Sequence, residues 1–119
     1  MKKRILIIED DQDILELLKI VFRDSGHEAI FSQTALDKDH ISVLHPDLIL
    51  LDVRIKGAAK GAELCKELKA DPKNEKLPIV LCSGEYNLPK IARECNADMY
   101  LTKPYDMMVL LFQVNRYLS

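Results

Sequence analysis

The chain lacks the features that mark membrane, secreted and nucleic-acid-binding proteins. In its 119 residues no apolar stretch approaches the roughly 18 residues that a membrane span needs. Only four apolar residues follow the basic start of the chain before Glu9, too few for the apolar region of a signal peptide. The formal net charge of −2 argues against a basic surface for nucleic acid. We therefore expect no membrane partner and no direct contact with nucleic acid.

Cysteine is also scarce, and the cysteines show no pairing pattern. The chain has three, Cys65, Cys82 and Cys95, and no two of them form a C-x-x-C pair. An odd number of widely spaced cysteines is typical of reduced, partly buried side chains in a cytosolic protein. We favour this interpretation over a redox or metal role, and we expect a cytoplasmic location.

What the chain does contain is a set of four short apolar runs, each ending in a polar residue. They are ILII before Glu9-Asp10, LILL before Asp52, IVLC before Ser83 and MYLT before Lys103. Apolar runs of about four to eight residues are typical of strands buried on both faces, as in a parallel sheet. Ligands of such sheets bind beyond the carboxyl ends of the strands. Three carboxylates, a hydroxyl and an ammonium should therefore meet at one edge.

Strands and helices alternate along the chain, without a repeat or a linker. We expect strands over 4–8, 28–32, 48–51, 79–82 and 99–102, a loop over 71–74, and helices from about 13, between 36 and 44, and over 61–70, 88–95 and 105–118. This alternation implies crossover connections. The chain should be one α/β domain over residues 1–119, with helices on both faces of a parallel sheet.

The four polar strand ends suit the handling of phosphate and a divalent cation. Asp52 is the candidate nucleophile, because a carboxylate can take a phosphoryl group and hold it as an acyl phosphate. Glu9 and Asp10 offer oxygen ligands to Mg²⁺, a hard cation usually held by carboxylates, waters and phosphate oxygens. Lys103 would contact one phosphoryl oxygen as a point charge, and Ser83 would donate a hydrogen bond to another. Each residue alone is commonly a cap or turn residue, but the full ordered set is hard to explain that way.

Four segments of the chain together resemble the receiver domain of two-component response regulators. They are ILIIEDD at 5–11, PDLILLDV at 46–53, PIVLCSG at 78–84 and ADMYLTKPY at 97–105. The resemblance implies a flavodoxin-like three-layer sandwich, with a five-stranded parallel sheet in the order 2-1-3-4-5 flanked by five helices. It also implies that Asp52 is the phosphoacceptor, and that the donor is a phosphohistidine of a histidine kinase or phosphotransfer protein.

The resemblance also implies the ligands of a cation, Mg²⁺ or alternatively Mn²⁺. Asp10 and Asp52 match direct metal ligands, Glu9 completes the acidic pair, and the main-chain carbonyl of Arg54 matches a third protein ligand. Lys103 matches the phosphate-binding lysine, and its bond to Pro104 matches a cis peptide.

The implied switch begins at the phosphoryl group, which draws the hydroxyl of Ser83 inward so that Tyr100 can rotate inward too. The surface formed by the helix over 88–95, the strand over 99–102 and the helix over 105–118 then changes. This face would bind a downstream effector or a second copy of the chain, and phosphate acts as a ligand that biases two arrangements.

The loop after Asp52 departs from the family pattern. Lys56 stands where the family commonly has proline, and Gly61 comes nine residues after Asp52 instead of eight. The loop over 54–60 should therefore carry an extra residue and be mobile, with the Lys56 side chain in solvent. The resemblance also implies that Arg54 and Glu85 flank the path of attacking water, where a pair of opposite charges would shield the acyl phosphate and so tune dephosphorylation.

The helix expected over 105–118 is apolar on nearly all sides. This predicts one face buried in the core and a second face that contacts a partner. Matching to the family places Leu110, Val114 and Leu118 in the core. Helical spacing then places three apolar residues on the opposite side as a docking face, namely Met108, Leu111 and Phe112.

We therefore expect a phosphorylatable signalling switch and not a metabolic enzyme, with no output domain in this chain. One alternative is a receiver fragment of a longer regulator. A second is an aspartate-nucleophile phosphohydrolase, which usually has another aspartate where this chain has Arg54. A third is a flavodoxin-like cofactor binder, disfavoured because three acidic residues follow the first strand. A degenerate receiver used only for docking is disfavoured by the complete set of acids, hydroxyl and lysine.

Overall fold

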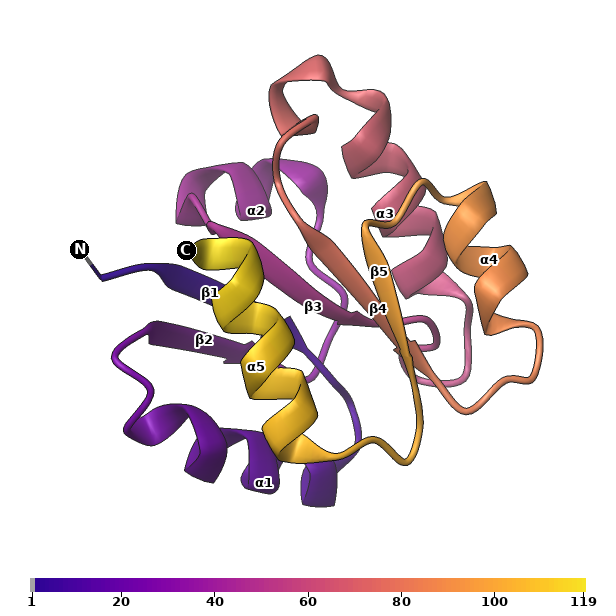
Figure 1. Cartoon of the computed structure of the whole chain (residues 1–119). Coiled ribbons are helices and arrows are strands. Elements are labelled where there is room, and N and C mark those ends of the chain that lie inside the picture. Colours follow the sequence, from indigo (N-terminus) through magenta and orange to yellow (C-terminus); the bar gives the residue numbers. More distant parts are fainter. Residues whose placement is uncertain (1) are drawn as a thin grey trace.

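A computed structural model gives the fold of residues 2–119, which contain one parallel sheet in the order β2-β1-β3-β4-β5 (Figure 1). The strands are β1 (Arg4–Ile8), β2 (Glu28–Ser32), β3 (Leu48–Asp52), β4 (Ile79–Ser83) and β5 (Met99–Thr102). Every pair of neighbouring strands is parallel. The predicted sheet and its strand order are confirmed.

Helices cover both faces of this sheet. One face is covered by α1 (Gln12–Arg23) and α5 (Met107–Leu118), and the other by α2 (Lys38–Leu44), α3 (Lys60–Ala70) and α4 (Leu88–Glu94). A short 3₁₀ helix, η1 (Pro72–Asn74), takes part of the segment predicted to be a loop, and Asp71 caps it through the N–H of Lys73. Within residues 2–119, no helix has both the length and the apolar character to cross a bilayer.

Alternate residues of the central strands enter two different cores. Ile5 and Ile7 of β1 pack with α1 and α5, whereas Leu6 and Ile8 pack with the helices of the other face. This follows from the two-residue period of a strand. Because both faces are covered, the central strands are apolar along their length, and polar side chains gather where the strands end.

Two aspartate caps fix the helices that follow β1 and β5. Asp11 caps α1 and Asp106 caps α5, and each carboxylate accepts hydrogen bonds from two backbone N–H groups. The Asp106 cap sets the start of α5 at Met107, two residues after the predicted start at Tyr105. The caps hold the loops that carry the polar strand ends.

The loop after β3 contains a closed turn. Lys56 and Gly57 have φ values of 55° and 80°, and Ile55 and Ala58 exchange two backbone hydrogen bonds of 2.9 and 3.2 Å. The extra residue is therefore absorbed in a two-residue turn, and the mobility of the loop stays a prediction. At Gly61, in the first turn of α3, a Cβ would lie 1.7 Å from the carbonyl oxygen of Asp52, so only glycine fits.

Candidate functional site

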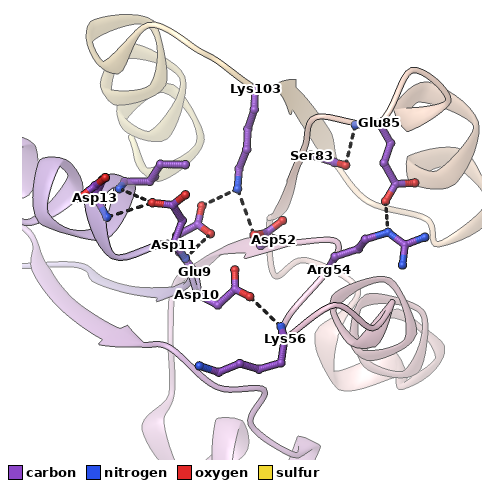
Figure 2. Close-up of polar contacts among 11 residues, drawn as sticks. Glu9, Asp10, Asp11, Asp13, Asp52, Arg54, Lys56, Ser83, Glu85 and Lys103 are labelled. Carbon is purple, nitrogen blue, oxygen red and sulfur yellow. Dashed lines mark hydrogen bonds and ion pairs between the residues drawn. The ribbon is translucent and has the colours of Figure 1, made fainter.

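Three carboxylates meet at the carboxyl edge of the sheet (Figure 2). Glu9 and Asp10 follow β1, and Asp52 ends the neighbouring strand β3. One oxygen from each carboxylate lies within 4.8 Å of the others. Glu9 and Asp52 are buried, whereas Asp10 is partly exposed. The structure thus gathers two buried acids and one accessible acid into one cluster.

Lys103 reaches this cluster from the loop after β5. Its Nζ lies 2.8 Å from Oε1 of Glu9 and 3.0 Å from Oδ2 of Asp52. The Lys103–Pro104 peptide is cis, as predicted. Burial alone would lower the pKa of Lys103, but the hydrogen bonds and charges of Glu9 and Asp52 raise it above its ordinary value. Lys103 is therefore a fixed cation at the edge of the acidic cluster.

Asp52 is held in an environment that disfavours its ionised form. Burial, followed by the hydrogen bond and charge of Glu9, raises the pKa of Asp52 from 3.8 to about 7, although Lys103 opposes this shift. One ammonium does not neutralise two buried carboxylates and Asp10 beside them. The cluster therefore favours a further positive charge.

The donor set fits Mg²⁺. The three clustered residues all offer carboxylate oxygens, which hard cations prefer. Ligand oxygens on opposite sides of Mg²⁺ are about 4.2 Å apart, because each lies about 2.1 Å from the ion, so a cluster within 4.8 Å is close to the required size. Carboxylates bind a metal in their ionised form, and three ionised carboxylates with one ammonium have an excess of two negative charges, equal in size to the charge of the ion. The backbone of Arg54, the other expected ligand, lies two residues beyond Asp52 on the same loop.

Ser83 ends β4, the strand next to β3. Its neighbour Cys82 is the register partner of Asp52, so Ser83 lies one position further along the same edge. The side chain is buried, and its Oγ accepts a 3.0 Å hydrogen bond from the N–H of Glu85. The hydroxyl proton of Ser83 is not used in that contact and can still be donated.

Arg54 and Glu85 form an ion pair near the acidic cluster (Figure 2). Nε of Arg54 donates to Oε1 of Glu85 at 2.6 Å, and Nη1 of Arg54 donates to the carbonyl of Gly57 at 3.4 Å. The predicted pairing of these opposite charges is confirmed, and Figure 2 shows the two side chains pointing toward one another. The pair joins the loop after β3 to the loop after β4.

Tyr100 does not point into the site. It lies on β5 with 42% of its surface exposed, and it lines a groove of about 510 Å³ together with residues of α4 and α5. The structure therefore holds the outward arrangement of this side chain.

The predicted docking face of α5 needs one correction. Met108 and Phe112 are 67% and 65% exposed, as expected for an outward face. Leu111 is only partly exposed and packs against the core below α1 and α5, so its placement with the other two was wrong. Leu111 comes one residue after the buried Leu110, which is a rotation of about 100° around the helix, so its side chain lies at the border between the buried and exposed faces of α5. Val109 is the third exposed apolar residue here, with 48% of its surface exposed.

One contact of the site was missed by sequence reasoning. The backbone N–H of Lys56 donates to Oδ2 of Asp10 at 2.7 Å, while the Lys56 side chain is exposed. The prediction for Lys56 concerned only its side chain, whereas the donor is its backbone N–H. The available signal was Gly57, because glycine is typical of the second central position of a two-residue type I′ turn.

Comparison with known proteins gives the family. The family model of the response regulator receiver domain matches residues 5–115. The chain is 31% identical over 119 residues to sporulation initiation phosphotransferase F of Bacillus subtilis (strain 168), and the match covers 99% of this chain and 95% of that protein. It is 32% identical over 117 residues to the DNA-binding response regulator MtrA of Mycobacterium tuberculosis (strain ATCC 25618 / H37Rv). That match covers 96% of this chain and 50% of MtrA, so the chain spans half the length of that relative.

A solved structure agrees with these relatives. The signal receiver domain of a signal transduction histidine kinase from Syntrophus aciditrophicus has a TM-score of 0.81 and 30% identity, with 98% of this chain and 89% of that chain covered. The chain therefore belongs to the response regulator receiver domains of two-component systems.

Proposed function

We propose that the chain is a phosphoacceptor switch in which Asp52 takes a phosphoryl group from a phosphohistidine of a sensor kinase or phosphotransfer protein. The observation that carries this proposal is the burial of the Asp52 carboxylate between an acidic cluster and Lys103. Oδ2 of Asp52 accepts from Lys103, so Oδ1 is the nucleophile. The new O–P bond forms as the P–N bond of the donor breaks, and the released imidazole takes up a proton.

Glu9, Asp10, Asp52 and the main-chain carbonyl of Arg54 would hold Mg²⁺ or Mn²⁺. When bound, the cation neutralises negative charge on Asp52 and on the incoming phosphoryl oxygens. Lys103 is close enough to Asp52 to bind one phosphoryl oxygen without a large movement. Ser83 would donate its hydroxyl proton to another oxygen.

The output is a changed surface. Movement of Ser83 toward the phosphoryl group would end the contact of its Oγ with the N–H of Glu85 and so release the start of the loop before α4. Tyr100 would then move inward from its exposed position. The face of α4, β5 and α5 would change its affinity for a downstream effector or a second copy, with Met108 and Phe112 of α5 as apolar contacts.

This function is signalling and not metabolic turnover. A phosphohydrolase would place an acid two residues after its nucleophile, but Arg54 stands there and turns toward Glu85. The same site chemistry would serve a stand-alone receiver and the receiver of a longer regulator, which differ in the effector. The three free, buried cysteines support action in the reducing cytoplasm.

Incubation with acetyl phosphate and Mg²⁺, followed by intact mass spectrometry, tests the proposal. The wild type should gain one phosphate, and Asp52→Asn should gain none because it loses the nucleophile. Asp39→Asn is a matched control, because Asp39 is an exposed residue of α2. An adduct that persists in Asp52→Asn, or that forms equally well with EDTA, would contradict the proposal.

A further inference from the structure

The turn after β3 has a geometry that leaves the backbone amides of its two central residues without a partner inside the turn. Lys56 and Gly57 both have φ values in the left-handed region, as in a type I′ turn. The flanking residues Ile55 and Ala58 form two backbone hydrogen bonds with one another. In such a turn the N–H of the first central residue has no partner within the turn. Here that N–H belongs to Lys56.

Two contacts connect the turn to the rest of the molecule. Ile55 is buried in the core that α2, α3 and α4 cover, which anchors the start of the turn. The carbonyl of Gly57 accepts a hydrogen bond from Arg54, which is itself paired with Glu85. These contacts connect the turn to the core and to the loop after β4.

The backbone amide of Lys56 forms a hydrogen bond with Asp10. The N–H of Lys56 donates to Oδ2 of Asp10 at 2.7 Å (Figure 2), which is the length of a charge-assisted hydrogen bond. Lys56 and Asp10 are 46 residues apart. A carboxylate has two oxygens, so one can accept from the amide while the other binds a cation. Without this contact, Asp10 would be a partly exposed side chain free to rotate.

We propose that the turn at Ile55–Ala58 is a positioning element for the cation site, and that the Lys56 amide holds Asp10 in the orientation that binds Mg²⁺. This inference rests on the cation site of the proposed function. The backbone of residue 56 acts through Asp10, and the lysine side chain is not required. Hydrogen-bonded partners of metal ligands commonly contribute about 10- to 100-fold to metal affinity.

Isothermal titration of the unphosphorylated protein with Mg²⁺ tests the role of the amide. Lys56→Pro removes the N–H and the positive φ, and Mg²⁺ should bind about 10-fold more weakly. Lys56→Gln loses the same positive charge but keeps the amide, so it should bind at least as tightly as the wild type. Lys56→Gly, which favours positive φ, should also retain affinity. The loss of charge alone would strengthen binding, so weaker binding in Lys56→Pro can only come from the backbone.

Two further measurements keep the test decisive if Lys56→Pro is poorly folded by circular dichroism. Gly57→Val keeps the amide but opposes the φ of 80°, and it should also weaken Mg²⁺ binding. By NMR, the Lys56 amide should exchange with solvent at least about 10-fold faster in Asp10→Ala than in the wild type, since its acceptor is gone.

The outcomes separate the two proposals. Equal Mg²⁺ affinity in the wild type, Lys56→Pro and Gly57→Val would overturn the positioning role and leave the phosphoacceptor function standing. An unchanged exchange rate in Asp10→Ala would also overturn it. A wild type that binds no Mg²⁺ would overturn the cation site itself, and the positioning role with it.

Discussion

Two lysine side chains lie at opposite edges of the same sheet. They differ in whether the positive charge of the lysine balances the negative charge of the carboxylates around it. Lys103 lies at the carboxyl edge between Glu9 and Asp52, with 19% of its side chain exposed. Lys69 of α3 lies at the amino edge, where only 6% of its side chain is exposed, and its Nζ is 2.8 Å from Oδ2 of Asp98. Both are largely buried ammonium groups paired with carboxylates.

The amino-edge lysine has every donor matched. Nζ of Lys69 donates to the carbonyls of Leu77 at 2.7 Å and of Asn74 and Glu75 at 3.4 Å, in addition to Asp98. The carboxylate of Asp98 also accepts from the N–H of Ile79. One positive charge meets one negative charge, and the cluster ties the segment after α3 to the start of β5.

Lys103, at the carboxyl edge, lies beside more carboxylates than its single positive charge can balance. This difference from Lys69 explains why the carboxyl edge can bind a positively charged ligand. Burial and the neighbouring Glu9 raise the pKa of Asp52 to about 7, because a single ammonium cannot compensate the cluster. A balanced cluster stabilises the fold, whereas an unbalanced one gains free energy by binding a cation or exchanging a proton.

Lys69→Met should produce the largest loss of stability. It leaves Asp98 and three carbonyls without their shared donor, so the free energy of unfolding should fall by about 3 kcal/mol, or roughly 10 °C in Tm. Urea denaturation and calorimetry measure this, and phosphorylation should be retained. Lys66→Met, an exposed residue of the same helix, is the matched control.

Lys103→Met, measured by the same denaturation experiments, tests the comparison from the carboxyl edge. Its cost should be smaller than that of Lys69→Met, because Asp52 can take up a proton when the ammonium is lost, but phosphorylation should be strongly impaired. Equal losses of stability in the two variants would break the comparison between the edges.

Asp52→Asn should stabilise the metal-free protein, by an amount that depends on pH. Since the folded protein holds the Asp52 proton up to a pKa of about 7 and the unfolded chain only up to about 3.8, wild-type stability should fall as pH rises between these values. The variant lacks this loss, so the difference should grow to about 2–4 kcal/mol above pH 7.

Denaturation of both proteins from pH 4 to pH 8 without divalent cations measures this difference. Added Mg²⁺ should reduce it, with about 1.4 kcal/mol of stabilisation of the wild type at ten times the Kd. Parallel stability curves for wild type and variant would show that the carboxyl edge is not electrostatically unbalanced.

The smallest effect is expected at the partly exposed ion pair of Arg54 and Glu85. Arg54→Ala or Glu85→Ala should change stability by less than about 0.5 kcal/mol, because exposed pairs contribute little. Either change should shorten the lifetime of phospho-Asp52 by a few-fold, because it opens the path for water. Loss of the mass adduct over time measures the lifetime, with the fully exposed Tyr86, changed to alanine, as the control. Equal decay rates in all four proteins would reject shielding by the pair.

The sequence predicted the fold and the convergence of the site because both depend on local patterns. The buried runs, such as ILII and LILL, are too apolar for anything but central strands. In a parallel sheet the ends of these strands share one edge, and the resemblance to receiver domains supplied the strand order that makes Glu9, Asp52, Ser83 and Lys103 neighbours. The ranges of the strands and most helices followed within a few residues.

Other features depend on distances that no local pattern contains. Leu111 was placed outward by spacing, but packing on the flank of α5 buries part of it. The Lys56 amide finds Asp10 only because a closed turn aims it there, and Lys69 finds Asp98 only across the sheet edge.

The sequence by itself therefore determined which residues stand at the carboxyl edge of the sheet, since strand periodicity and apolar runs are encoded along the chain. Only the tertiary structure decided how those residues are charged and oriented. The reason is that desolvation, Coulomb interaction and hydrogen bonding all depend on separations in space, and these are set when β1, β3, β4 and the loop after β5 are packed together.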